Sequence, residues 1–153
     1  MKALSFMLLA IGVLACGGEK KDELGPYIQK LNEVDAQYVK KLFAYRDYLK
    51  TPEFSKAGDI EQVMQQFHDE LANYPEIDDK KIKAMNNELQ RTIKGSMRKL
   101  VEPDFPTFVP NAQSAIRMVL EELVVVHNNM EKLWGESGKT EPFPLKWNFE
   151  NIE

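Results

Sequence analysis

Two pairs of histidine and methionine are the residues whose types and spacing best fit a metal-binding or haem-binding site. His127 precedes Met130 by three residues, and His68 follows Met64 by four. Side chains three or four residues apart are neighbours on a helix, so each imidazole would lie beside a thioether. That ligand pair suits copper(I), or a haem iron with one axial ligand of each type. The same residues also fit a helical core, in which methionine fills irregular space and histidine bonds to a carbonyl or carboxylate, and we favour this second interpretation.

The rest of the sequence has no pattern typical of a catalytic or cofactor-binding site. It contains no glycine-rich phosphate loop, no serine nucleophile elbow, no HExxH pair and no repeated Glu-x-x-His. The pairs Glu121-Glu122 and Asp78-Asp79 fit solvated or helix-capping positions. We therefore expect a protein that is not an enzyme and that has no cofactor and no metal. Binding of a small molecule, copper or haem near His127 is the alternative.

The charge balance argues against a nucleic-acid partner. The 153 residues have a formal net charge of −4, whereas a sequence-nonspecific grip on nucleic acid needs a basic face. Lys80, Lys81 and Lys83 form a short basic cluster beside two aspartates, and we interpret them as part of a mixed surface.

The first residues, MKALSFMLLAIGVLAC, combine a basic start with an apolar stretch. Lys2 supplies the charge, and residues 3–15 are apolar apart from Ser5 and Gly12. This stretch is shorter than the roughly 20 helical residues that cross a bilayer, and it matches the hydrophobic region of a secretory signal. Cys16, the only cysteine, directly follows it and cannot form a disulfide within the chain.

Residues 13–16, VLAC, resemble the lipobox of a bacterial lipoprotein signal peptide. The resemblance implies cleavage before Cys16, acylation of its sulfur, and a further acyl chain, such as palmitate, on the new N-terminus. Two or more chains give stable anchoring in a membrane. Gly17, in place of aspartate, would permit sorting to the outer membrane, facing the periplasm, in a host with two membranes. The resemblance covers only the first 16 or so residues, and Val13 and Leu14 depart from the commonest pattern.

Three alternatives to the lipoprotein signal remain open. Val13 and Ala15 also fit an ordinary secretory cleavage site. The segment could instead be an uncleaved anchor or the first helix of a cytosolic protein. With a lipoprotein signal, residues 1–15 are removed, and residues 16–25 are the lipidated cysteine and a flexible tether of small and charged residues.

Residues 26–135 show the apolar periodicity of four helices. Pro26 fits the first turn of a helix that continues to about Lys50, although Asp35 interrupts its apolar stripe. The next helices are expected from Asp59 to about Tyr74 and from Asp78 to Leu100. Within the third, Gly95 indicates a bend or a close helix crossing. Short connections favour antiparallel neighbours, so the predicted fold is an all-α, up-down four-helix bundle.

Residues 103–110, PDFPTFVP, contain three prolines and predict an extended connection, after which Asn111 caps the fourth helix. Glycines at 135 and 138 end that helix. Residues 136–153 then form an extended C-terminal tail, in which large apolar side chains alternate: Phe143, Leu145, Trp147 and Phe149. An alternating pattern indicates an extended segment with one apolar face. The tail either folds back along the bundle or serves as a docking strand for a partner.

These features together predict a lipid-anchored bacterial cell-envelope protein. Its expected role is non-catalytic binding or scaffolding at the membrane surface. The expected partners are the membrane, through the acyl chains on Cys16, and an unidentified envelope protein. The four alternating tail residues are the candidate contacts with that protein.

Overall fold

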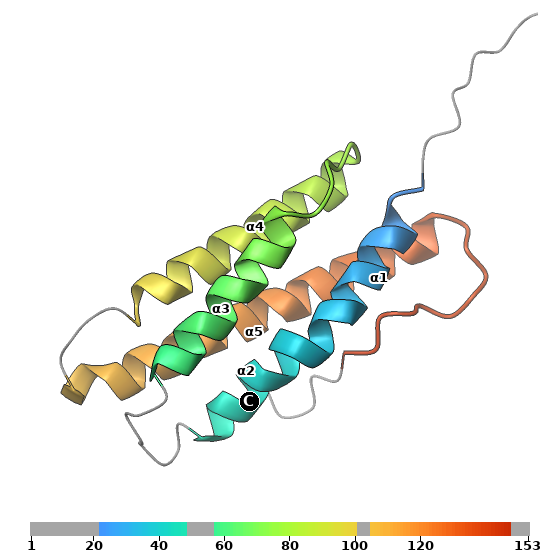
Figure 1. Ribbon diagram of the computed structural model, residues 1–153. Helices are drawn as coiled ribbons and strands as arrows, with labels where there is room; N and C mark the ends of the chain where they lie inside the picture. The colour runs from blue at the N-terminus through green and yellow to red at the C-terminus, as the bar shows by residue number, and fades with distance from the viewer. Residues whose placement is uncertain (1–21, 49–56, 101–104, 148–153) are drawn as a thin grey trace, which may run out of the picture.

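The computed structural model describes residues 22–48, 57–100 and 105–147. Its elements in chain order are α1 (Leu24–Val34), a π-helical segment η1 (Asp35–Val39), α2 (Lys40–Tyr48), α3 (Ala57–Ala72), α4 (Lys80–Arg98) and α5 (Phe105–Glu136). α1, η1 and α2 follow one another as a single long rod, so the four rods form an up-down bundle (Figure 1). Helices account for all regular structure in the described part of the chain, which confirms the predicted all-α bundle.

The order of the helices around the bundle places each rod between two neighbours. The α1–η1–α2 rod packs against α3 and α5, and α4 packs against the same two helices from the other side. The long first rod and α4 therefore lie at opposite corners, as do α3 and α5. The beginnings of α1 and α4 and the ends of α3 and α5 meet at one end of the bundle (Figure 1).

The first rod begins at Leu24, two residues before the expected boundary of the bundle. The Asp22 carboxylate accepts hydrogen bonds from the backbone N–H groups of Leu24, at 3.2 Å, and Gly25, at 3.5 Å, and so starts the helix. Pro26 lies in the first turn, as predicted. Asp35, the residue that interrupts the apolar stripe, opens the π-helical segment. A π segment inside an α-helix widens one turn, and here it accommodates a half-buried carboxylate that pairs with Lys40 at 3.4 Å.

Apolar side chains of all four rods form one core. A polar link crosses this core near the end where α1 begins. The buried Tyr27 hydroxyl of α1 donates to the Asn86 Oδ1 of α4 at 3.0 Å, and the Asn86 Nδ2 donates to the carbonyl of Leu71 at the end of α3, at 3.4 Å. Asn86 thereby satisfies its own buried polar groups and joins three rods.

The N-terminal cap of α4 lies one residue later than expected, at Asp79, and the helix begins at Lys80. The Asp79 carboxylate, in place of that of Asp78, accepts from the N–H groups of Lys81, at 2.9 Å, and Ile82, at 3.3 Å. Gly95 makes no close helix crossing, because a Cβ built there would meet nothing within 4 Å. The predicted explanation of this glycine by a close crossing is therefore wrong.

α5 begins well before the predicted start of the fourth helix. Residues 105–110 are its first residues, so the predicted extended connection is wrong for this stretch, and Asn111 lies inside the helix and not at its cap. Proline is tolerated in a first turn, whose N–H groups have no partner within the helix, and Pro106 is the second residue of α5. Pro110 lies deeper in the helix and removes one backbone hydrogen bond.

Candidate functional site

The C-terminal tail, from Ser137 to Trp147 in the described chain, folds back along the bundle. Leu145 and Trp147 are buried, with 4% and 7% of their surfaces exposed, and Phe143 is half-buried against the core. The alternation seen in the sequence thus places these side chains on the bundle. Phe149 lies outside the described residues. The use of these residues as contacts with a partner protein stays a prediction, and in this conformation Leu145 and Trp147 contact the protein's own helices.

Asn32 of α1 holds the tail through its backbone. Its Nδ2 donates to the carbonyl of Pro144 at 3.1 Å, and its Oδ1 accepts from the N–H of Lys146 at 3.4 Å. One amide side chain therefore makes the donor and acceptor contacts that a neighbouring strand would make. Nearer the start of the tail, the indole N–H of Trp134 donates to the carbonyl of Glu141 at 2.8 Å.

His127 packs among the aromatic side chains of the tail. Its ring meets Phe143 edge-on with centroids 5.2 Å apart, and it lies 6.5 Å from the ring of Trp147. Met130, the thioether proposed as its partner, is fully buried in the core. The histidine thus has a packing role beneath the tail, which fits the core interpretation of this pair.

The second pair lies at another corner of the bundle. His68 of α3 has its Nδ1 3.2 Å from the Oδ1 of Asp69, and Met64 is fully buried. Because α3 and α5 lie at opposite corners of the bundle, His68 and Met64 do not come close to His127. No group of three or more histidine, cysteine or acidic residues in the described ranges is placed to hold a metal ion.

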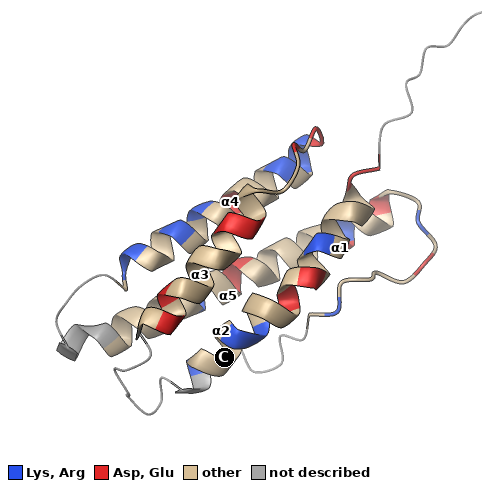
Figure 2. Ribbon diagram, viewed as in Figure 1, with Lys and Arg blue, Asp and Glu red and all other residues tan. Residues whose placement is uncertain are grey.

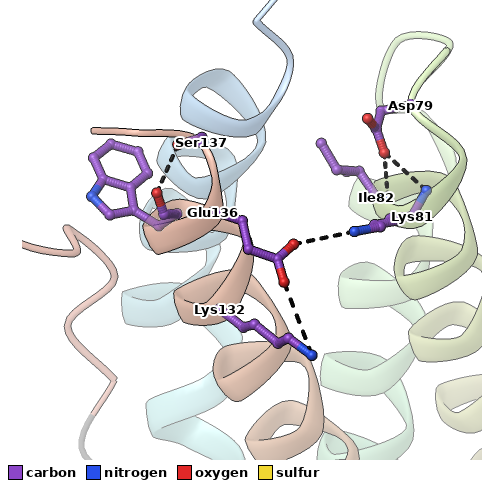
Figure 3. Close-up of polar contacts among 7 residues, drawn as sticks. Asp79, Lys81, Ile82, Lys132, Glu136 and Ser137 are labelled. Carbon is purple, nitrogen blue, oxygen red and sulfur yellow. Dashed lines mark hydrogen bonds and ion pairs between the residues drawn. The ribbon is translucent and has the colours of Figure 1, made fainter.

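Three elements meet around an open cleft of about 1010 Å³ at the end of the bundle where α1 and α4 begin. The Glu136 carboxylate of α5 lies between Lys81 of α4, at 3.2 Å, and Lys132, at 4.0 Å (Figure 3). The Glu23 carboxylate accepts from the backbone N–H groups of Asp78, at 3.0 Å, and Asp79, at 2.6 Å. Glu23 thus joins the start of α1 to the start of α4, and Glu136 joins the end of α5 to the start of α4.

Lys139 connects the tail to the start of the first rod. Its ammonium group donates to the Asp22 carboxylate and lies 4.7 Å from the ring centroid of Trp134. The hydrogen bond from Lys139 lowers the pKa of Asp22, with smaller contributions from the backbone N–H groups that start α1. The Ser137 hydroxyl, beside the same cleft, donates to the carbonyl of Trp134 at 2.7 Å (Figure 3). The polar groups thus join helix ends to one another and form a structural junction.

Sequence reasoning missed the residues that fasten the tail, chiefly Asn32, Trp134 and Lys139. Asn32 is an ordinary polar residue on the outer side of a helical pattern, and its partners are 112 and 114 residues away in the chain. Nothing in the spacing indicates such a contact. Trp134 and Lys139 carried a weak signal, since an aromatic ring at a helix end often attracts a nearby cation.

Cys16 and the whole signal sequence lie outside the described residues. Within the parts of the chain that the structure covers, no helix combines the length and hydropathy needed to cross a bilayer. Comparisons with family models, with curated proteins and with solved structures give no match.

Proposed function

We propose that this protein is a lipid-anchored component of the bacterial cell envelope with a non-catalytic binding or scaffolding role at the membrane surface. The position of Cys16 carries the proposal, because the single cysteine of the chain follows a basic residue and a 13-residue apolar stretch. In a host with two membranes, the protein is placed at the outer membrane and faces the periplasm.

The arrangement of the bundle is compatible with a short lipid tether. Five residues separate Cys16 from Asp22, the first described residue, so the tether spans at most about 20 Å. Asp22 and Glu23 are fastened to Lys139 and to the start of α4. The end of the bundle at which α1 begins would therefore stay close to the membrane surface.

The lipid anchor can be tested by replacing the cysteine. Cys16→Ala should abolish incorporation of radiolabelled palmitate and shift the protein from the membrane fraction, or leave it as an uncleaved precursor. Ser5→Ala, a change inside the apolar stretch, is the matched control and should be processed and labelled like the natural chain. Palmitate labelling of Cys16→Ala, or its absence from the natural chain, would refute the anchor.

The binding role is tested separately at the tail. Phe143 is half-buried, so a photo-crosslinking residue at that position can reach both the bundle and a partner. In the lipidated protein within its host, we expect a discrete adduct with an envelope protein. The matched control is the same residue at Gln66, an exposed position on α3. Adducts that are identical at both positions, or only intramolecular at Phe143, would contradict the role of the tail in partner binding.

A further inference from the structure

The outward face of α4 carries a row of basic side chains. Five exposed residues form this basic row: Lys80, Lys83, Arg91, Lys94 and Arg98. At 3.6 residues per turn they fall within a sector of about 80° and extend over about 27 Å of helix. The opposite side of α4 holds the buried residues, so the basic row points away from the core.

Few carboxylates lie along this face, and one of them, Glu76 in the connection before α4, pairs with Lys83 of the row at 3.7 Å. α4 contains six basic residues and one acidic residue, Glu88, which pairs with Arg91 at the flank of the row. In the described part of the chain, no carboxylate pairs with Lys80, Lys94 or Arg98. Because the whole chain is −4 and α4 is +5, the rest of the chain has a formal charge of −9.

The positive charge is separated from the negative charge in space. α3, the neighbour of α4, has four acidic residues and no lysine or arginine. Figure 2 shows blue segments along α4 and red segments on α3. Lys81 pairs with Glu136 and Lys83 with Glu76, which fits the sequence-based interpretation of the first turn as a mixed surface. That interpretation did not consider the continuation of the row to Arg98.

The composition of the row fits an anionic lipid surface better than a protein. The other exposed residues of α4 that lie between the basic side chains are Ala84 and Asn87. Among the described side chains, the exposed large hydrophobic residue is Val125, which lies on α5. Protein interfaces are centred on buried apolar or aromatic side chains, and single-stranded nucleic acid stacks on exposed aromatic rings. Anionic headgroups need only a cluster of basic residues on one helix face.

The proposed tether brings this face within reach of such headgroups. α4 begins at the same end of the bundle as α1, and Glu23 binds directly to the backbone at Asp78 and Asp79. We infer that the basic row of α4 docks the domain on its side against anionic phospholipid headgroups of the leaflet that holds the anchor. This inference rests on the proposed lipid anchor at Cys16.

The expected strength follows from the number of basic residues. Each lysine or arginine close to an anionic membrane strengthens binding about fivefold. Removal of two residues from the row should therefore lower the ratio of docked to undocked protein about 25-fold. Docking should also weaken as salt shortens the Debye length from about 10 Å at 0.1 M to about 3 Å at 1 M.

The test uses the lipidated full-length protein in vesicles of phosphatidylcholine, with or without one-third phosphatidylglycerol. In the lipidated chain the sulfur of Cys16 is blocked, so Asn87→Cys provides one free thiol for a fluorophore in the middle of the basic row. Ala44→Cys, an exposed position on α2 at the opposite corner, is the control. Spin-labelled headgroups should quench the fluorophore at position 87 only in the anionic vesicles, and should not quench the one at position 44.

Charge variants complete the test. In the Asn87→Cys protein, Lys94→Gln with Arg98→Gln should remove most of the quenching. Lys40→Gln with Lys41→Gln removes the same charge from α2 and should leave quenching unchanged. Equal quenching at positions 87 and 44, equal quenching in neutral vesicles, or equal effects of the two double variants would each overturn the docking. A reactive thiol in the otherwise natural chain would instead refute the lipid anchor, so the two failures are distinguishable.

Discussion

Replacing Trp147 with alanine should release the tail from the bundle. Trp147 is 7% exposed, so its indole ring is buried against the bundle and holds this part of the tail in place. Truncation of a buried tryptophan costs about 3–5 kcal/mol in a closed core. Here the cost is limited by the net free energy of docking, because a detached tail regains about 1–2 kcal/mol of backbone entropy per residue. We expect a loss of about 2–3 kcal/mol.

The loss is measured by thermal and urea unfolding of the purified mature protein. For a domain of this size it corresponds to a fall in melting temperature of about 6–15 °C. Binding of a hydrophobic dye should rise at the same time, because the surface beneath the tail becomes exposed. Val125→Ala removes an apolar side chain that is already 50% exposed, and should change stability by less than about 0.5 kcal/mol.

A double-mutant cycle with Asn32 separates release of the tail from simple loss of packing. Asn32→Ala removes two hydrogen bonds to the tail and should cost about 1–2 kcal/mol by itself. Once Trp147→Ala has released the tail, Asn32 has nothing left to hold, so the combined loss should fall short of the sum by about 1 kcal/mol or more. Strict additivity, or a Trp147→Ala variant as stable as the natural chain, would refute this account of the tail.

Three further predictions concern the bundle itself, each measured by equilibrium unfolding. Gly95→Ala should stabilise α4 by up to about 1 kcal/mol, because a Cβ meets open space there. Gly138→Ala should instead cost about 1 kcal/mol, because that residue has φ +73°. Changes in stability of the same sign in the two variants would contradict this explanation. Tyr27→Phe should cost about 1–2 kcal/mol by leaving the buried Asn86 Oδ1 without its donor, and Tyr27→Phe with Asn86→Leu should recover part of the loss. Burial, and then a neighbouring carboxylate, raises the pKa of Glu122, so its ionised form disfavours the fold at neutral pH. Glu122→Gln should stabilise at pH 7 by less than about 0.5 kcal/mol, and the gain should vanish below about pH 4, where the carboxyl is protonated in both states; a gain independent of pH would exclude this cause.

The fold could be predicted because it depends on apolar patterns within single helices, which are visible in short stretches of sequence. The apolar residues of α3 and α4 recur every three or four residues, and Phe67, Leu89 and Ile93 among them are fully buried. The start of α5 could not be predicted in the same way. Three prolines in eight residues disfavour a helix, and the structure nevertheless extends α5 back to Phe105. Pro106 is compatible with the helix because it lies in the first turn, and Pro110 removes one backbone hydrogen bond.

The candidate site could be predicted only in part. The alternation of Phe143, Leu145 and Trp147 correctly indicated an extended segment with one apolar face. The contacts that receive this segment come in part from Asn32 and His127, which are distant in sequence and have no distinguishing neighbours. Contacts of this kind arise from the arrangement of the helices, so spacing along the chain does not reveal them.

The contacts of Asp22 and Glu23 also determine how the molecule would respond to mechanical load. A pull on the N-terminal side of Asp22 would reach the bundle at the start of α1. Glu23 ties that point sideways to the backbone at Asp78 and Asp79, and Asp22 ties it to Lys139. The force would therefore be shared among α1, the start of α4 and the segment after α5. The end of the bundle would yield as a unit under shear, and α1 would not peel away one turn at a time.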